Sequence, residues 1–442
     1  MAMHSQNRSR GDRALNKYCR SLRDSRLAKN ASWLLLGQGV SFLVQAAYFI
    51  ILARLLGTEQ YGIYVAAAAL AAIVAQYSSL GSGFVFMQHV SHKPERFAIY
   101  WGNILVSSLG IGSVLSALLY FVGPRLVGSA SPTLLLTIAV GDCVCQQLTN
   151  ASSQVFQAFD MMRITAILNT SISLARLLAA GIMLAVTRHA AAEGWAFAAM
   201  IVSVLATLGA VATITLKFGK PEFSARLFAS RAYDGFIYSV SGSTTTVYND
   251  VDKVLLGHFG MNAATAIYAV AYKIINVSNV PMTSVYTAAF PKFFRLGADG
   301  MAKTVPFARK LVKRTSVLGI ATAALILVSS PLIPHVIGPN YAQSASALRW
   351  LCLIPFFRSF HLSAGDAIAG AGKQRFRLYS QLLAAGLNFA LNVYLIPHYS
   401  WRGAAWASLL TDGSLGALNW IVAFYLLKRE SMLGFSTSSI NV

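Results

Sequence analysis

Hydrophobic positions in this 442-residue chain come in long blocks, with none of the short alternating segments that are typical of a membrane β-barrel. A helix needs about 20 apolar residues to cross roughly 30 Å of hydrocarbon. Because lipid offers no hydrogen-bond partners, the backbone must satisfy itself within helices. The pattern predicts twelve transmembrane helices, over residues 31–53, 61–86, 99–122, 132–157, 164–187, 193–216, 235–257, 263–291, 315–338, 343–370, 378–397 and 402–427.

Composition supports this interpretation. Hydrophobic residues make up 56% of the chain and charged residues only 12%, whereas soluble domains carry about 25% charged residues. The sequence therefore predicts an all-α polytopic membrane protein. Cys143 and Cys145 lie in an apolar block, and we interpret them as packing residues because no disulfide framework or zinc-ligand spacing is present.

The net charge of +21 could suggest nucleic-acid binding, but the basic residues are distributed as expected for a membrane topology. Most Lys and Arg residues fall in alternate segments between the predicted helices, while the other loops hold only Arg54, Arg125, Arg188 and Arg402. Cytoplasmic loops are the ones rich in Lys and Arg. We therefore expect a bacterial inner-membrane protein whose two termini are both cytoplasmic.

Residues 1–30 form a strongly basic N-terminal tail. Leu15, Tyr18 and Leu22 follow helical spacing within it, which predicts a short amphipathic helix on the anionic inner leaflet. A disordered basic tail that only sets orientation is the alternative. No A-x-A site follows the first apolar block, so we do not expect a cleavable signal peptide.

An internal repeat divides the chain. Arg54-Leu-Leu-Gly57 resembles Lys253-Val-Leu-Leu-Gly257, and Gly194-Trp-Ala-Phe-Ala resembles Gly403-Ala-Ala-Trp-Ala. Parallel repeats are a recurrent transporter design, with the site between the halves. The predicted organisation is two six-helix lobes around a central cavity, with these segments: tail 1–30, N-lobe 31–216, linker 217–234, C-lobe 235–427 and tail 428–442.

Several ionisable residues lie within the apolar blocks, where each costs at least about 2.5–3.5 kcal/mol on insertion scales. They are Asp142, Arg176, Asp250, Asp252, Lys253, Lys273, Arg349, Arg358 and Asp366, with Asp412 as a further candidate. Such residues either serve function or form structural ion pairs between helices. An intramembrane carboxylate can change its protonation during transport. The candidates for coupling to an ion are therefore Asp250, Asp252, Asp142 and Asp366.

Polar stripes on predicted helices 1, 7 and 8 indicate a shared hydrated cleft, although structural polar packing is an alternative. Hydroxyl, amide and aromatic groups would hold a glycan there, and Lys or Arg would hold an anionic headgroup. The expected substrate-binding residues are Arg54, Lys253, Lys273, Gln38, Gln45, Tyr248 and Asn276.

Catalytic motifs are missing from the sequence. It contains no P-loop, no G-x-S-x-G, no H-E-x-x-H and no histidines paired at metal-ligand spacing. We therefore expect a transporter rather than an enzyme, with no catalytic residue, no metal and no cofactor. A proton or sodium gradient would supply the energy.

Several ordered segments resemble polysaccharide-export flippases of the Wzx type, in the multidrug/oligosaccharidyl-lipid/polysaccharide (MOP) superfamily. These segments are Ala53–Tyr64, Asp252–Gly257, Ala266–Lys273, Phe290–Lys292, Ile337–Ala342, Asn388 with Asn392, Ile396–Pro397 and the Gly403 motif. The resemblance spans roughly residues 29–427. It implies charged cavity residues at Arg54, Asp252, Lys253 and Lys273, and two lobes that give alternating access.

The resemblance further implies a substrate and partners. The expected substrate is an undecaprenyl-pyrophosphate-linked oligosaccharide, moved from the cytoplasmic to the periplasmic leaflet for exopolysaccharide or O-antigen synthesis. Membrane lipids and the polysaccharide polymerase and export machinery are expected partners, and nucleic acid is not. A MurJ-like lipid II flippase, usually with fourteen helices, is disfavoured by the twelve predicted here. Two alternatives remain open: a cation-coupled drug or metabolite antiporter, and a membrane glycosyltransferase or polymerase.

Overall fold

The computed structural model describes the backbone of residues 2–90, 93–187 and 189–438. It describes side chains between residues 39 and 432, except those of residues 91–92, 188, 241 and 245. Gln38 and the predicted amphipathic pattern within residues 1–30 therefore lie outside the described side chains.

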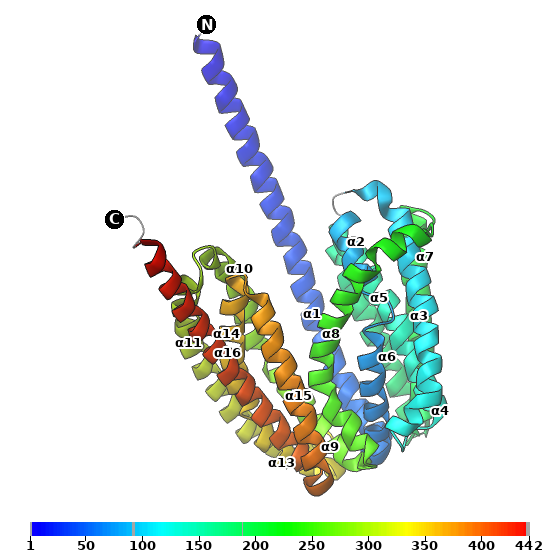
Figure 1. The fold of residues 1–442 in the computed structure, drawn as a ribbon. Coiled ribbons are helices and arrows are strands. Elements are labelled where there is room, and N and C mark those ends of the chain that lie inside the picture. The colour runs from blue at the N-terminus through cyan, green and yellow to red at the C-terminus, as the bar shows by residue number, and fades with distance from the viewer. Residues whose placement is uncertain (1, 91–92, 188, 439–442) are drawn as a thin grey trace.

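Within the described residues the chain is helical in every block that the hydrophobic pattern predicts (Figure 1). The first half contains α1 (Ala2–Ala75), α2 (Ser82–Val90), η1 (Pro94–Arg96), α3 (Phe97–Leu126), α4 (Pro132–Ala139), the π-helical η2 (Val140–Gln146), α5 (Gln147–Ala158), α6 (Met162–Thr187) and α7 (Ala192–Phe218). The second half contains α8 (Ala225–His258), α9 (Asn262–Ser278), α10 (Val280–Gly297), α11 (Met301–Ser329), η3 (Ser330–Leu332), α12 (Ile333–Val336), η4 (Pro339–Tyr341), α13 (Ala342–Leu351), α14 (Ile354–Gly370), α15 (Gln374–Tyr399) and α16 (Trp401–Ser438).

Several predicted helices are interrupted. The block 263–291 divides into α9 and α10 beside Pro281, and the block 132–157 passes through the π-helical turn η2. Proline lacks the N–H group that a helix interior needs. By length and apolar composition, seven helices or helical stretches of the described chain can cross a membrane. The all-helical membrane fold is confirmed, and the number of twelve spans stays a prediction.

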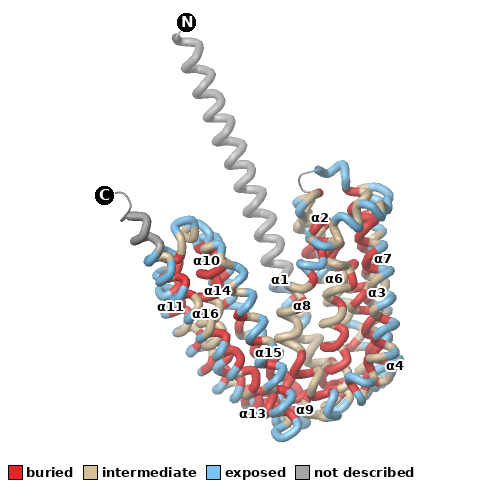
Figure 2. Tube along the Cα trace, in the orientation of Figure 1, coloured by how far each residue is buried: buried red, intermediate tan, exposed pale blue. Residues whose placement is uncertain are grey.

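The two halves converge at one end of the molecule, where α9 and α13 lie, and diverge at the other (Figure 1). At the narrow end one apolar core joins both halves and includes Leu55, Trp195, Tyr268 and Tyr341. Away from it the halves have separate cores, represented by Trp101 in the first half and by residues of α11, α14 and α16 in the second. The core shared by both halves therefore lies at the narrow end, and towards the wide end α8 also packs on the first half, through Leu227 and through Tyr238 stacked on Phe84. Figure 2 shows how the buried residues are distributed along both halves.

Two glycines that the repeat aligns have different structural roles. Gly57 has φ of 66° and kinks α1, a conformation that glycine adopts without the steric penalty of a side chain. Gly257 lies within α8, and a Cβ atom placed there would be 2.4 Å from the Cβ of Ala66 in α1. In the second half the chain instead turns at Gly260, with φ of 71°. The repeat thus preserves a helix junction rather than an identical backbone.

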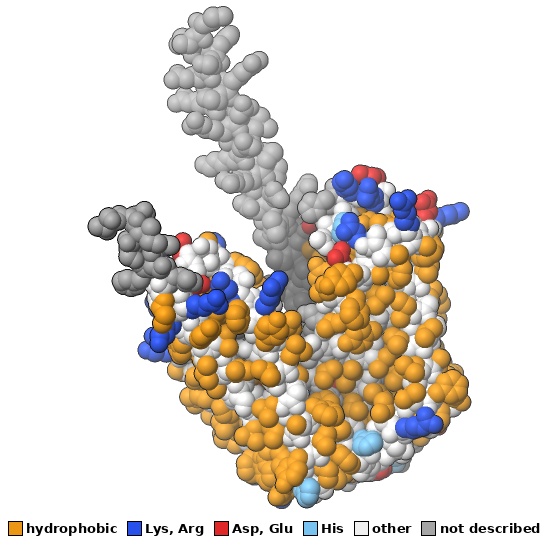
Figure 3. Space-filling view, in the orientation of Figure 1, with side chains coloured by type: hydrophobic (Ala, Val, Ile, Leu, Met, Phe, Trp, Pro, Cys, Tyr) orange, Lys and Arg blue, Asp and Glu red, His pale blue; other side chains and the backbone are white. Residues whose placement is uncertain are grey.

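The outer surface carries many exposed large apolar side chains, among them Val114, Phe121, Leu216 and Val328. On the face drawn in Figure 3, hydrophobic side chains cover the flanks of both halves, and Lys and Arg gather mainly at the wide end. An exposed apolar surface this extensive suits contact with lipid rather than with water.

Candidate functional site: a polar cavity between two lobes

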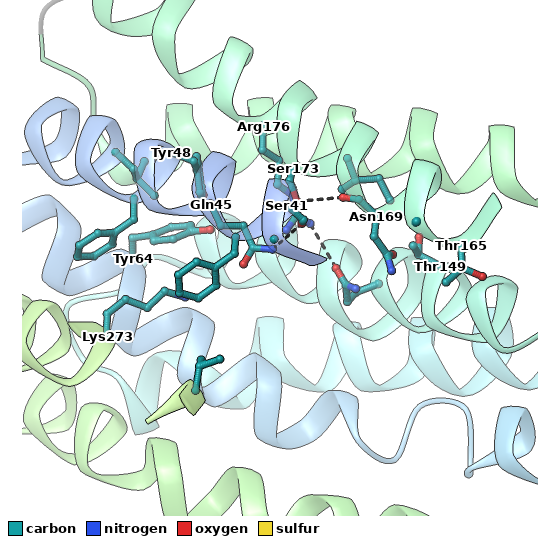
Figure 4. Close-up of a pocket in the computed structure, with 18 of the residues that line it drawn as sticks. Ser41, Gln45, Tyr48, Tyr64, Thr149, Thr165, Asn169, Ser173, Arg176 and Lys273 are labelled. Carbon is teal, nitrogen blue, oxygen red and sulfur yellow. Dashed lines mark hydrogen bonds between the residues drawn. The ribbon is translucent and has the colours of Figure 1, made fainter. Parts of the chain in front are cut away.

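A cavity of about 980 Å³ lies between the halves, and most of its lining comes from the first half (Figure 4). Hydroxyl, amide and aromatic side chains predominate. The polar and aromatic lining residues are Ser41, Phe42, Gln45, Tyr48, Phe49, Tyr61, Tyr64, Gln146, Thr149, Gln157, Thr165, Asn169, Ser173, Arg176, Lys273 and Ser284. Arg176 and Lys273 are the only charged side chains among these described lining residues. The cavity wall is therefore cationic and rich in hydrogen-bonding groups.

Arg176 on α6 supplies the positive charge of the first half. Its guanidinium donates to Ser203 Oγ at 3.0 Å and to Gln146 Oε1 at 3.4 Å. Its Nε atom is buried and has no hydrogen-bond partner in the described structure. No ion pair of Arg176 lies within 4.0 Å among the described residues, so neutral partners hold this guanidinium at the cavity wall.

Lys273 on α9 contributes the positive charge of the second half. It is exposed, and none of the described residues gives it a hydrogen bond or an ion pair. Near it, Gln45 Nε2 donates to Ser41 Oγ at 3.0 Å, and Ser41 Oγ lies 3.1 Å from Ser173 Oγ (Figure 4). The predicted residues Lys273 and Gln45 thus face the same cavity, from opposite halves.

An apolar groove of about 390 Å³ adjoins this cavity. The two share four lining residues, namely Phe42, Gln45, Phe49 and Lys273. Most of the remaining groove lining is aliphatic and comes from α9, α11, η3 and α12, and Asn276 also belongs to it. The polar cavity and the apolar groove therefore meet at Lys273.

Lys253 lies elsewhere, in a buried charge cluster of α8. Its Nζ atom is 2.7 Å from Asp250 Oδ1 and 3.7 Å from Asp252 Oδ1, and it lies 4.8 Å from the centre of the Tyr272 ring. Asp252 is 1% exposed and also accepts a hydrogen bond from Tyr268 Oη. The structure therefore places Lys253 in an ion-pair cluster outside the central cavity, contrary to the expectation that it lines the cavity.

Arg54 also lies outside the cavity. Its guanidinium donates to Val336 O at 2.6 and 3.1 Å and to His335 O at 3.4 Å, at the narrow end. Asn262 Nδ2 donates to Glu59 Oε1 at 2.6 Å nearby. The expectation that Arg54 lines the cavity is corrected, because its side chain instead bridges the two halves.

The remaining predicted residues separate into different surroundings. Tyr248 lines a smaller pocket of the second half and donates to Asp412, while Asn276 accepts a hydrogen bond from Arg358 at 3.3 Å. Asp366 forms an ion pair with Arg377 at 3.1 Å. Asp142 lies in η2, close to Arg176. The four coupling candidates therefore do not form one site.

Sequence reasoning missed most of the polar lining supplied by α5 and α6, such as Asn169 and Ser173. Both fall in the apolar block 164–187, whose charged residue Arg176 and whose lack of an obvious repeat partner drew no prediction of a polar face. The charge of Arg176 was noted among the intramembrane residues. Asn169 and Ser173 precede Arg176 by seven and three residues, so all three lie on one face of a helix. This spacing was the signal that could have predicted the polar face.

Comparison with known proteins agrees with this architecture. The family model described as "Polysaccharide biosynthesis protein" matches residues 27–297, and the MatE model matches residues 239–394. A curated relative, the uncharacterized membrane protein MJ1068 of Methanocaldococcus jannaschii, is 24% identical over 194 residues. The match covers 43% of this chain and 38% of that protein, so it spans well under half of the relative's length.

Solved structures show the same fold at low identity. Lipid II flippase MurJ in an inward closed conformation has a TM-score of 0.72 at 14% identity, with 88% of this chain and 87% of that chain covered. An inward-facing multidrug resistance MATE family transporter of the MOP superfamily has a TM-score of 0.66 at 14% identity, covering 89% and 97%. A MOP superfamily transporter from Pyrococcus furiosus scores 0.60 at 15% identity, covering 90% and 95%. The family match over more than half of the chain and these shared folds lead to one conclusion: the chain belongs to the polysaccharide biosynthesis protein family and has the fold of the MOP superfamily transporters.

Proposed function

We propose that this protein is a Wzx-type flippase that moves an undecaprenyl-pyrophosphate-linked oligosaccharide from the cytoplasmic to the periplasmic leaflet. The product would supply exopolysaccharide or O-antigen synthesis. One observation supports this most strongly: a cationic polar cavity shares its wall with an apolar groove. A lipid-linked sugar has the same two-part chemistry.

The headgroup fits the cavity. Arg176 and Lys273 face it from opposite halves, and no carboxylate belongs to its described lining. A diphosphate accepts charge-assisted hydrogen bonds from both kinds of cation. Sugar hydroxyls match the amide and hydroxyl groups of Gln45, Asn169 and Ser173, and sugar faces match the tyrosine rings.

The polyprenyl chain fits the groove. Apart from Lys273, where the groove meets the cavity, the described groove wall carries no charged side chain that would need to be desolvated. Because the groove and cavity meet at Lys273, a bound lipid would keep its chain in apolar surroundings while its diphosphate reaches the ammonium group.

Orientation follows from charge. The Lys and Arg side chains gather mainly at the wide end in Figure 3, and cytoplasmic segments are enriched in these residues. We therefore assign the wide end to the cytoplasm of the bacterial inner membrane, so that the conformation faces inward. Export would then open the narrow end, with a proton or sodium gradient as the energy source and Asp142, Asp250, Asp252 and Asp366 as coupling candidates.

A deletion strain tests this function. It is expected to lose surface polysaccharide and to accumulate undecaprenyl-linked repeat units on the cytoplasmic side, and a plasmid copy should restore export. A plasmid that carries Arg176→Gln together with Lys273→Gln should not restore it despite normal abundance of the protein in the membrane. Normal polymer at the surface of the deletion strain would refute the proposal.

A cation-coupled antiporter is the second candidate, and the MatE match over residues 239–394 favours it. An antiporter for small cations needs acidic groups in its binding cavity, whereas the described lining here is cationic. Drug susceptibility of the deletion strain distinguishes the two. Increased susceptibility together with normal polysaccharide would support the antiporter. A membrane glycosyltransferase gains no support, since the similar solved structures are described as a flippase and as transporters.

A further inference from the structure

The second half encloses a separate pocket of about 260 Å³ between α8, α10, α14, α15 and α16. Polar side chains form much of its wall, including Tyr248, Arg358, His361, Arg377 and Asn419. The pocket is much smaller than the central cavity and is below the usual range for drug-sized ligands, roughly 300–1,000 Å³. A site of this size suits one sugar ring rather than an oligosaccharide.

Charge within this pocket is arranged in two layers. Arg358 and Arg377 line the pocket, whereas the neighbouring carboxylates of Asp366 and Asp412 do not belong to the described lining and are 4% and 1% exposed. Arg377 is held by Asp366 at 3.1 Å. A ligand in the pocket therefore meets guanidinium groups before it meets any acid.

Arg358 forms no direct ion pair with a described carboxylate, although Asp412 lies close enough to interact with it electrostatically. Among the described residues no ion pair of Arg358 lies within 4.0 Å; its guanidinium donates to Tyr272 Oη and Asn276 Oδ1, each at 3.3 Å. Asp412 is instead bonded by Tyr248 and lies 3.9 Å from His361 Nε2. A guanidinium held by two long bonds to neutral groups keeps most of its capacity to bind an anion.

Other polar atoms of the pocket wall are also unsatisfied. His361 Nε2 and Asn419 Oδ1 are buried and have no hydrogen-bond partner in the described structure. Leaving such atoms unpaired costs free energy, so buried polar atoms normally have protein, water or ligand partners. The ring nitrogen of His361 and the amide oxygen of Asn419 share the pocket wall with the guanidinium of Arg358. This combination suits a sugar ring that carries both hydroxyl groups and a carboxylate.

We propose that this pocket is a second subsite, which binds one acidic sugar unit of the transported oligosaccharide through its carboxylate. The inference rests on the proposed function and adds a substrate class to it. Arg358 would hold the carboxylate, while His361 and Asn419 would bind hydroxyl groups of the same ring. The pocket lies next to the central cavity, because Thr283 lines the pocket and its neighbour in the chain, Ser284, lines the cavity. One oligosaccharide could therefore extend from the cavity to the pocket. The diphosphate would remain with Arg176 and Lys273.

Transport of two matched probes tests the subsite. Full-length protein in proteoliposomes is offered undecaprenyl diphosphate that carries a trisaccharide ending either in glucuronate or in glucose. We expect wild type to move the glucuronate probe faster, and Arg358→Gln to lower the glucuronate-to-glucose ratio of rates about tenfold, the value of one charge-assisted hydrogen bond. Arg358→Lys should keep part of the preference. Arg349→Gln is the matched control, since Arg349 lies in the same half, bonded to Ser330 and outside the pocket.

Each outcome decides between distinct explanations. An unchanged ratio in well-folded Arg358→Gln would overturn the subsite while leaving the flippase proposal intact. A parallel fall in both rates would also overturn it, because both probes carry the diphosphate and such a fall indicates a structural role or diphosphate binding. Failure of wild type to move either probe would contradict the proposed function itself.

Discussion

At the scale of single residues, the two lysines of the second half show how neighbours decide the role of a charge. Lys253 lies between two carboxylates and against a tyrosine ring, whereas Lys273 has no hydrogen bond or ion pair among the described residues. Both were predicted as substrate ligands because a lysine within a lipid-spanning block demands an explanation. The sequence shows each charge but not its contacts: the carboxylates that pair with Lys253 lie on its own helix, α8, and among the described residues none forms an ion pair with Lys273.

Replacing Lys273 should impair transport without affecting folding. Lys273→Gln removes an exposed cation that forms no hydrogen bond or ion pair among the described residues, so we expect abundance and thermal stability close to wild type. Loss of one charge-assisted interaction with the headgroup should lower the rate of lipid-linked oligosaccharide transport about tenfold. Lys217→Gln, at the exposed end of α7, is the control. An unaltered transport rate for Lys273→Gln would remove this residue from the site.

Replacing Lys253 should instead damage the protein. Lys253→Ala leaves Asp250 and the buried Asp252 without their ammonium partner, and breaking a buried pair typically costs about 3–5 kcal/mol. The expected result is a fall in membrane abundance and in detergent melting temperature, and Lys217→Ala should show neither effect. A stable Lys253→Ala protein that has lost only transport would return this residue to the substrate pathway.

At the scale of elements, the contact between α1 and α8 depends on small residues. Gly257 packs against Ala66 so closely that an added Cβ would lie 2.4 Å from the Cβ of Ala66. The hydrophobic pattern predicted both helices, and the repeat marked Gly57 and Gly257 as equivalent. It could not show that one permits a kink and the other a close crossing, because that difference depends on which surfaces meet in three dimensions.

Substitutions at this crossing should compensate each other. Gly257→Ala forces α8 away from α1, and overpacking of this kind costs about 1–3 kcal/mol. Adding Ala66→Gly to Gly257→Ala removes the opposing methyl group and should recover most of the melting temperature in detergent. The single Ala66→Gly variant reports the separate cost of glycine in a helix. If the changes in melting temperature of the two single variants simply added up in the double variant, the two residues would not be in contact.

At the scale of the whole molecule, the fold follows from where apolar surface is shared. The largest core shared by the two halves lies at the narrow end, and a polar cavity lies between the halves. Apolar blocks, charge alternation and the repeat were enough to predict a two-lobed helical membrane protein with a central cavity. They did not predict that α5 and α6 form so much of its wall, since that depends on how helices rotate within a bundle.

Transport should require separation of the halves at the narrow end. There Asn262 bonds Glu59, Tyr341 Oη donates to Ala53 O at 2.9 Å, and Arg54 bonds Val336 O. A thiol-specific cross-linker between Glu59→Cys and Asn262→Cys, with the four native cysteines replaced, should stop transport, and a reducible linker should restore it after reduction. Each single cysteine variant serves as the control. Transport that continues under complete cross-linking would contradict alternating access through this end.

The most direct test of the central claim is a transport measurement on purified protein in proteoliposomes, with a fluorescent undecaprenyl-diphosphate oligosaccharide and quenching from outside. Wild type is expected to move the probe between leaflets, and the double variant Arg176→Gln, Lys273→Gln should fall to the rate of protein-free vesicles. Equal rates for the wild type and the folded double variant would show that the cationic cavity is not the route of the headgroup.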